Sequence, residues 1–178
     1  QLGICELSKL KGVYDKLLRQ NKSGNVQGIA QVHQDIAEQN PAGAFLCGYP
    51  VFREICRLQV RKTARFDENE YILLLTLKAG EYTGSKVSDV NLFHIRNAMP
   101  HLVETLKKSL RPGDAVAQFS DSQYVILLSA CTYEGGMLVA NRIISKFYQD
   151  HKVYRNLKIK IHIEKVKTAE HILNKYSG

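Results

Sequence analysis

The most informative pattern along the chain is a set of short apolar segments that differ in how they alternate with polar residues. Residues 70–78 contain a continuous aliphatic run, which predicts a central strand covered on both faces. Residues 157–164 alternate strictly between apolar and polar side chains, as expected of a half-exposed strand near a sheet edge. Residues 115–120 and 124–128 flank a polar tip at Asp121 and predict a tight hairpin.

Helical spacing of apolar residues predicts the elements between these strands. One helix is predicted over residues 51–65, and another at 132–148 with Thr132 as its cap. The helical pattern of residues 92–110 contains Pro100, so its regular part is predicted to begin near that proline or to bend there. Residues 167–176 predict a short last helix. The resulting order favours an α+β fold, a ferredoxin-like antiparallel sheet with helices on one face.

The first 42 residues carry two narrow apolar seams of coiled-coil type, separated by a polar break at residues 21–25. The seams consist of Leu7, Leu10, Tyr14 and Leu17, and of Ile29, Val32 and Ile36. We interpret residues 1–42 as a helical segment, either a linker, which is favoured, or a dimerisation element. Residues 43–178 form the predicted α+β domain.

Composition narrows the class of protein. The chain has 178 residues, 44% of them hydrophobic, and a formal net charge of +8. No apolar run reaches membrane-spanning length and no secretory signal pattern opens the chain, so we expect a cytoplasmic protein without membrane contacts. Because it begins at Gln1 rather than Met, we expect a piece of a longer protein. The positive charge is compatible with nucleic acid or anionic ligands but identifies neither.

The cysteines and histidines give no sign of a metal or cofactor site. The cysteines are widely scattered, without a CxxC pair or a histidine at ligand spacing, and are expected to be free thiols in a reducing compartment. They are Cys5, Cys47, Cys56 and Cys131. The six histidines show neither metal-ligand nor triad spacing. We therefore expect no cofactor.

A row of arginines follows one side of the predicted helix at 51–65. The row has four-residue spacing and consists of Arg53, Arg57, Arg61 and Arg65. A solvated face is the favoured interpretation. A DNA-reading helix would mix such residues with Asn, Gln or Ser for base edges, and this row has little of that.

The hairpin and the start of the domain resemble the GGDEF family of diguanylate cyclases. Residues 46–53, Leu-Cys-Gly-Tyr-Pro-Val-Phe-Arg, are similar to the family's opening Leu-Thr-Gly-Leu-Pro-Asn-Arg-Arg. The family's hairpin signature is Gly-Gly-Asp/Glu-Glu-Phe. In this chain its five positions are taken by Ser120, Asp121, Ser122, Gln123 and Tyr124. The resemblance covers residues 45–164 and implies the same ferredoxin-like frame.

The same resemblance implies that the catalytic chemistry is lost. Thr76 stands where the family has a magnesium-binding Asp, and Ser122 stands at the acidic signature position. Val51 replaces the Asn that contacts guanine, and an aliphatic side chain offers no amide donor or acceptor. Phosphoryl transfer needs carboxylates to hold the metal ions that neutralise developing charge. We therefore expect a non-enzymatic domain.

The chain also contains a sequence pattern that resembles a regulatory site of the family. Residues 111–114, Arg-Pro-Gly-Asp, resemble the inhibitory Arg-x-x-Asp product site that lies just before the signature. The Arg111 guanidinium and the Asp114 carboxylate suit the edge of guanine and the phosphates of cyclic di-GMP. An ordinary helix end and turn, the favoured interpretation, explain the same residues.

Nearly the whole chain also resembles the C-terminal region of a group of Firmicutes regulators of the SARP type, which carry a bacterial transcriptional activator domain. The residues that carry this resemblance are 43–58, 109–114, 120–125 and 132–136. It implies a DNA-binding domain upstream of this chain, and it implies that the helices before Asn40 continue a helical region. The alternative of a homodimer through the N-terminal helices depends on their apolar seams.

Three hypotheses follow. The favoured one is a non-catalytic regulatory or interaction domain of a bacterial transcriptional regulator. The second is a cyclic di-GMP receptor that uses Arg111 and Asp114 on an inactive cyclase frame. The third, an active nucleotidyl enzyme with unfamiliar residues, is the least favoured.

Overall fold

The computed structural model describes residues 28–37, 42–66, 69–79 and 87–166. The chain divides into two units, residues 1–40 and 41–178. In the first unit, α2 (Ile29–Ile36) carries the second predicted seam, and all three of its apolar residues are exposed. The first seam, Leu7 to Leu17, and the short last helix predicted at residues 167–176 lie outside the described residues.

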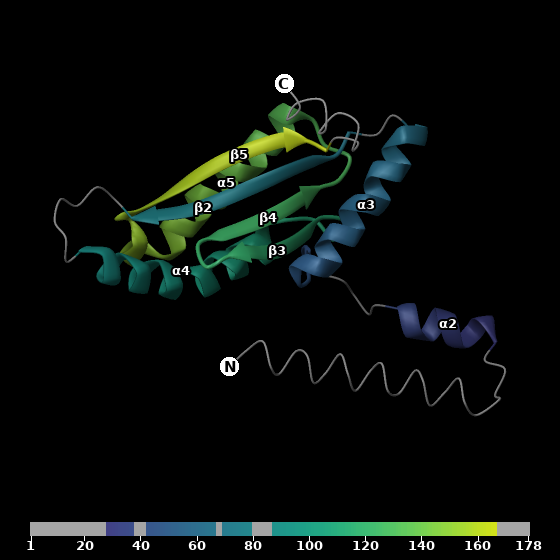
Figure 1. Ribbon diagram of the computed structural model, residues 1–178, viewed down its shortest axis with the longest axis horizontal. Helices are drawn as coiled ribbons and strands as arrows, with labels where there is room; N and C mark the ends of the chain where they lie inside the picture. Colours follow the sequence, from purple (N-terminus) through teal and green to yellow (C-terminus); the bar gives the residue numbers. More distant parts are fainter. Residues whose placement is uncertain (1–27, 38–41, 67–68, 80–86, 167–178) are drawn as a thin grey trace, which may run out of the picture. The chain divides into compact units, whose positions relative to one another are not determined.

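The second unit is built on a five-stranded sheet in the order β1-β3-β4-β2-β5 (Figure 1). The strands are β1 (Phe45–Leu46), β2 (Tyr71–Ala79), β3 (Ala115–Ser120), β4 (Gln123–Leu128) and β5 (Leu157–Lys165). β1 pairs parallel with β3, and the other neighbours are antiparallel. The predicted central strand lies between β4 and β5, and the predicted edge strand β5 is at the edge of the sheet.

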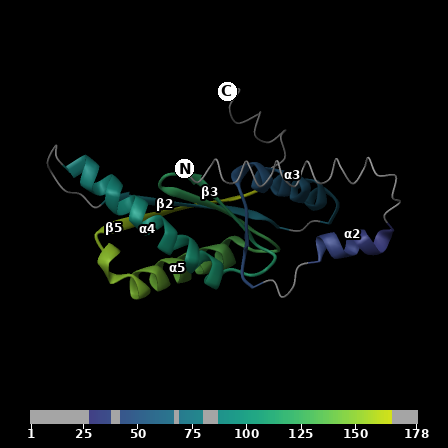
Figure 2. The ribbon, with the colours of Figure 1, turned by 90° about the horizontal axis from the view of Figure 1, so that it is seen from below.

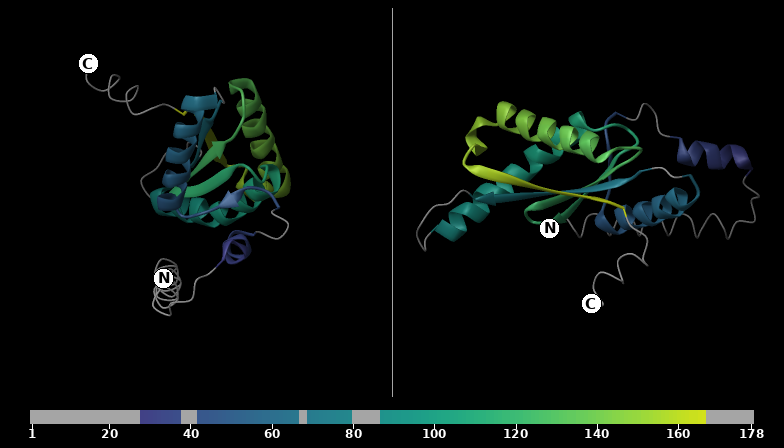
Figure 3. Two further views of the ribbon diagram at one scale, coloured as in Figure 1. Left: turned by 90° about the vertical axis from the view of Figure 1, so that its right-hand side faces the viewer. Right: turned by 90° about the horizontal axis from the view of Figure 1, so that it is seen from above.

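Helices cover both faces of this sheet. The helices of the domain are α3 (Tyr49–Phe66), α4 (Val87–Ser109) and α5 (Tyr133–Asp150), with a 3₁₀ turn at Lys152–Tyr154. α4 and α5 lie together on one face and α3 on the other (Figures 2 and 3). Thr132 caps α5 as predicted, since its Oγ1 accepts a hydrogen bond from the Gly135 amide at 3.1 Å.

The alternation along β2 shows how the two faces differ. Leu73, Leu75 and Leu77 are at most 1% exposed and lie in the large core beneath α4 and α5. Ile72 and Leu74 point to the other face and are only half-buried. The core on that side is small and consists of Phe52, Ala115, Ala117, Val125 and Leu127.

The α+β, ferredoxin-like fold is confirmed, but the structure differs from the sequence analysis in three details. β1 adds a short parallel edge strand, held by the Cys47 amide donating to the Val116 carbonyl at 3.0 Å. α3 covers the second face of the sheet, where the small side chains of Ala115 and Ala117 leave room for Phe52. The prediction that a regular helix begins near Pro100 is wrong, because α4 is already helical from Val87.

No helix in the part of the chain that the structure describes has the length and apolar character needed to cross a bilayer.

Candidate functional site

The β3–β4 hairpin is held by hydrogen bonds among its own polar side chains. Ser120 Oγ donates to Gln123 Oε1 at 3.0 Å and accepts from the Ser122 amide at 3.3 Å. Gln118 Nε2 donates to the Ser120 carbonyl at 3.1 Å, beside an irregularity in the strand pairing between Gln118 and Ser120. Neutral polar groups therefore hold the tip of this hairpin.

β2 brings Thr76 directly against this hairpin. Thr76 pairs with Gln123 in the sheet register, and Gln123 Nε2 donates to Thr76 Oγ1 at 3.0 Å. The Leu77 amide donates to the Ser122 carbonyl at 2.8 Å. Thr76 and Ser122, which the sequence analysis singled out, are thus close together, and neutral groups run from Ser120 through Gln123 to Thr76.

Charged residues near the hairpin do not form a metal site. Asp121 is the acid of the tip, and its side chain is 80% exposed. It pairs with Arg96 at 3.4 Å, where solvent screens the interaction. Among the described residues, no group of three or more His, Cys, Asp or Glu side chains is placed to hold a metal ion.

Arg111 and Asp114 meet at the turn between α4 and β3. The Asp114 side chain is buried, and its Oδ2 accepts from the Arg111 backbone amide at 2.9 Å. Its Oδ1 accepts from the Ser129 amide at 3.2 Å, at the end of β4. The Arg111 residue itself is exposed. The carboxylate therefore closes the turn and ties it to β4, while the guanidinium faces solvent.

The arginine row is a solvent-facing surface over the part that the structure describes. Arg53 and Arg57 both pair with Glu54, at 3.7 and 2.6 Å, and their side chains are more than half exposed. Arg61 is exposed, and the Arg65 side chain lies outside the described residues. This arrangement agrees with the favoured interpretation of a solvated row.

The cysteines that the structure describes are free thiols, as predicted. Burial raises the pKa of the Cys47 and Cys131 thiols and raises that of Cys56 to about 11. These thiols are protonated at neutral pH, which does not favour nucleophilic chemistry. Cys5 lies outside the described residues.

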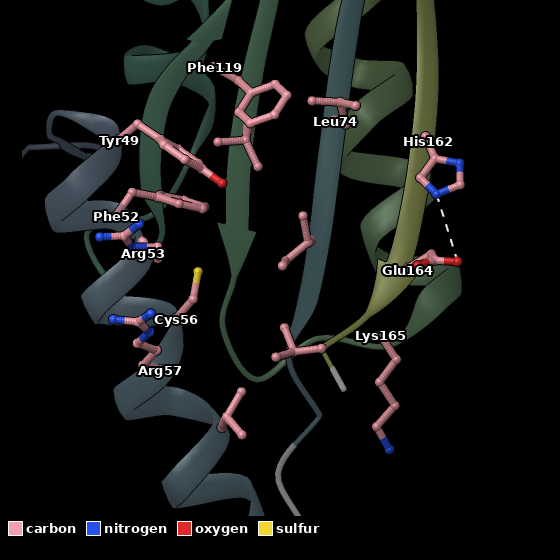
Figure 4. A pocket seen from close by; sticks show the side chains of 14 residues that line it. Tyr49, Phe52, Arg53, Cys56, Arg57, Leu74, Phe119, His162, Glu164 and Lys165 are labelled. Atoms are coloured by element: carbon pink, nitrogen blue, oxygen red, sulfur yellow. Dashed lines mark ion pairs between the residues drawn. The ribbon is translucent and has the colours of Figure 1, made fainter. Parts of the chain in front are cut away.

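A groove on the α3 face was not anticipated from the sequence (Figure 4). It has a volume of about 450 Å³ and lies between α3, β2, β4 and the end of β5. Phe52, Cys56 and Leu74 contribute to its mostly apolar wall, and Arg53, Arg57 and Lys165 also line it. At one end, Tyr49 and Phe119 meet edge to face with ring centroids 5.1 Å apart.

One signal in the sequence pointed toward this groove without identifying it. The apolar row of α3, together with Ile72 and Leu74 of β2, predicts that the second face of the sheet is buried. In the structure α3 alone covers only part of that face. Which part stays open depends on where α3 crosses the sheet, and that is a tertiary property.

The fold described above is that of GGDEF domains of known structure. The chain is similar to a DGC protein from Thermotoga maritima, with a TM-score of 0.54 and 14% identity, over 76% of this chain and 95% of that one. It is similar to the FimX GGDEF domain from Pseudomonas aeruginosa, with a TM-score of 0.51 and 16% identity, over 79% of this chain and 88% of that one.

A third similar structure is the coiled coil and GGDEF domain of DgcB from Caulobacter crescentus in complex with c-di-GMP. Its TM-score is 0.51 and its identity 9%, over 98% of this chain and 90% of that one. No protein-family model and no curated protein matches the sequence. At these identities the likeness is one of fold, so the chain contains a domain of the diguanylate cyclase-like, GGDEF-like fold.

Proposed function

We propose that this chain is a non-catalytic regulatory or interaction domain of a cytoplasmic bacterial transcriptional regulator, built on a GGDEF-like frame. The observation that carries the proposal is the neutral hydrogen-bonded series from Ser120 through Gln123 to Thr76, in the place of the metal-binding carboxylates. The DNA is contacted by an upstream domain outside this chain.

The physical reason lies in the charge that phosphoryl transfer develops. In nucleotidyl chemistry, metal ions bridge the phosphates and neutralise that charge, and carboxylates hold the metal ions. Hydroxyl and amide groups that already satisfy one another offer a divalent cation only weak, neutral ligands. Asp121 is exposed and bound to Arg96, so it does not replace the missing acids.

The test is an assay for cyclic di-GMP and pyrophosphate with the purified chain, GTP and either Mg²⁺ or Mn²⁺. We expect no product above the level without protein. Metal-dependent formation of a linear or cyclic guanine dinucleotide would overturn the proposal. A mock purification from the same host without this chain provides the control, because any product that it forms comes from a contaminating enzyme.

For the N-terminal helices, a linker is the favoured role, and a homodimer through them is the alternative, to which α2 contributes the second seam. Ile29 and Ile36 are each 72% exposed and Val32 is 47% exposed, all at the three- and four-residue spacing of a coiled-coil seam. Sedimentation of the full chain is expected to show a dimer that Ile29→Asp/Ile36→Asp converts to monomer. Gln34→Asp, off the seam, should leave the dimer intact. A monomeric parent chain would remove this part of the proposal.

A second candidate function is a cyclic di-GMP receptor, and one observation favours it. The buried Asp114 carboxylate accepts the Arg111 backbone amide, so the turn presents the exposed Arg111 at a defined place on the surface. Both carboxylate oxygens of Asp114 already accept backbone amides, which leaves it less able to receive guanine and ranks this function second.

Thermal unfolding with cyclic di-GMP separates the two functions. Ligand at one hundred times its dissociation constant adds about 2.7 kcal/mol of stability. For a chain of this size that raises the Tm by roughly 5 to 10 °C. A receptor shows this rise in the parent chain and in the control Arg155→Ala but loses it in Arg111→Ala. A regulatory domain without this ligand shows no rise in any of the three.

A further inference from the structure

The groove beside α3 has the size and the lining of a small-molecule site. Its volume of about 450 Å³ falls within the roughly 300 to 1,000 Å³ that is usual for such sites. These sites are mostly apolar, and a small number of polar or charged groups fix the orientation of the ligand. The groove has this composition, since its wall is mostly apolar and charged side chains from α3 and β5 lie beside it.

The apolar wall is only partly covered by the domain itself. Phe52 is 2% exposed, but Cys56, Ile72 and Leu74 stay half-buried between α3 and β2. Burial raises the pKa of the Cys56 thiol to about 11, so the thiol adds no charge to this wall at neutral pH. Because apolar surface gains stability when it leaves water, the wall favours a ligand with an apolar body.

The charged side chains at the groove have a positive balance. Arg53 and Arg57 line it from α3, and Lys165 lines it from the end of β5. Glu54 is shared between Arg53 and Arg57, at 3.7 and 2.6 Å. Glu164 is the acid among the described lining residues. Three cations thus face two acids, and the remaining positive charge favours a ligand with an anionic head group.

The two ends of the groove differ in chemistry. Tyr49 and Phe119 form an aromatic end, at the top of the view in Figure 4. Lys165 lies at the other end, because it pairs with Tyr71 at the start of β2, whereas the hairpin that follows Phe119 pairs with the far end of β2. Arg57 is about 12 Å along α3 from Tyr49, at 1.5 Å per residue. The groove therefore suits a ligand whose apolar chain and charged head lie at opposite ends.

We propose that this groove binds a fatty acid from solution, with its carboxylate at Arg57 and Lys165 and its apolar chain along Cys56 and Leu74 toward Tyr49. Guanidinium and ammonium groups form strong charge-assisted hydrogen bonds with a carboxylate. The pair between Arg57 and Glu54 is exposed, so its rearrangement costs little. The site lies on the second face of the sheet and does not depend on the role proposed for the hairpin.

Titration calorimetry of the full chain at neutral pH tests the class of ligand. The probes are dodecanoate, octanoate and dodecyltrimethylammonium, each below its critical micelle concentration. A buried methylene group is worth about 0.8 kcal/mol, or roughly fourfold in the dissociation constant, so octanoate should bind at least tenfold more weakly than dodecanoate. Dodecyltrimethylammonium, with the same chain and the opposite charge, should also bind at least tenfold more weakly. Equal affinity for the two head groups, or no binding of dodecanoate, would overturn the proposal.

A pair of double variants tests the position of the head group. Arg53→Ala/Arg57→Ala should weaken the binding of dodecanoate at least fivefold, because it removes two of the cations that line the groove. Arg61→Ala/Lys62→Ala removes the same charge from exposed positions of α3 that do not line the groove, and should leave the affinity unchanged. Equal weakening by both variants would mean that the net charge of the chain, and not this site, attracts the ligand.

Labelling of the native Cys56 thiol tests the position of the apolar chain. With Cys5, Cys47 and Cys131 replaced by Ser, saturating dodecanoate should slow the reaction of Cys56 with maleimide several-fold. In the matched control, Cys131 is the cysteine that is kept, and its rate should not change. An unchanged Cys56 rate, or equal slowing of both thiols, would overturn the proposal. Protection of Cys56 that rises with protein concentration and not with dodecanoate would do the same, since a second copy of the chain would then occupy the groove.

Discussion

The two faces of the sheet are built from the same strands but are covered in different ways. On one face, α4 and α5 bury Leu73, Leu75 and Leu77 of β2 almost completely. On the other, α3 alone packs over Ala115 and Ala117, and Leu74 stays half-buried. Neighbouring leucines of one strand therefore have different environments, because the covering helices and not the residue type decide their burial.

The two faces therefore differ in their contribution to stability and in how open they are to contacts with other molecules. The face under α4 and α5 is a closed core that tolerates little change in volume. The α3 face holds the groove, the solvated arginine pair and, at one end, Tyr49 and Phe119. Contacts with another molecule would disturb the second face less, since fewer buried contacts have to be given up there.

The largest expected effect is a loss of leucine volume in the closed core. Leu75→Ala should lower the free energy of unfolding by about 2 to 5 kcal/mol, because Leu75 is fully buried. Leu74→Ala should cost less, about 1 to 2 kcal/mol, because Leu74 is only half-buried beside the groove. Urea unfolding of both variants measures the two losses, and equal losses would contradict the comparison of the faces.

Gly43 and Gly48, at the start of the domain, test the contrast between tight packing against α4 and looser packing near α3. Gly43 has φ +72°, and an added Cβ would meet the Lys107 carbonyl oxygen of α4. Gly43→Ala should therefore destabilise by about 2 to 4 kcal/mol, from left-handed strain and overpacking together.

Gly48, at the start of α3, is the matched control. Its added Cβ would meet only Pro50 Cδ, at 3.7 Å, so Gly48→Ala should stay within about 0.5 kcal/mol of the parent. Thermal unfolding of both variants gives the comparison. A Gly43→Ala protein as stable as Gly48→Ala would show that the contact with α4 is not tight in solution.

Asp114 and Asp121 are compared to test whether the Asp of the Arg-x-x-Asp pattern contributes to the stability of the fold. Asp114→Ala leaves the Arg111 and Ser129 amides without their buried acceptor, and we expect a loss of about 2 to 3 kcal/mol. Asp121→Ala removes an exposed ion pair with Arg96 and should cost less than about 0.5 kcal/mol. If chemical denaturation finds equal small losses, the carboxylate of Asp114 does not hold the turn.

The smallest effect is on reactivity rather than stability. Because burial raises the pKa of the Cys56 thiol to about 11, the fraction of thiolate at pH 8 is about one in a thousand. With Cys5, Cys47 and Cys131 replaced by Ser, the alkylation rate by iodoacetamide should rise about tenfold per pH unit between pH 7 and 10. A plateau near pH 9 would mean that Cys56 titrates as an exposed thiol and that the groove wall is hydrated.

The sequence by itself determined the local parts of this protein. A continuous aliphatic run predicted β2 as a central strand, and alternation predicted β5 as an edge strand. The polar tip predicted the β3–β4 hairpin, and Thr132 predicted the start of α5. The sequence also identified Thr76 and Ser122 as neutral residues at the two positions where the resemblance led us to look for acids. These features depend on the period of a strand or helix and on turn chemistry, all of which act over a few residues.

Only the tertiary structure decided how these elements pack against one another. It placed α3 on the second face of the sheet, extended α4 as a helix on both sides of Pro100, and made Asp114 the acceptor for two amides that are far apart in sequence. It also placed Gln123 against Thr76 and left the groove beside α3. Each of these depends on which distant surfaces meet, and packing between elements determines that, whereas local pattern does not.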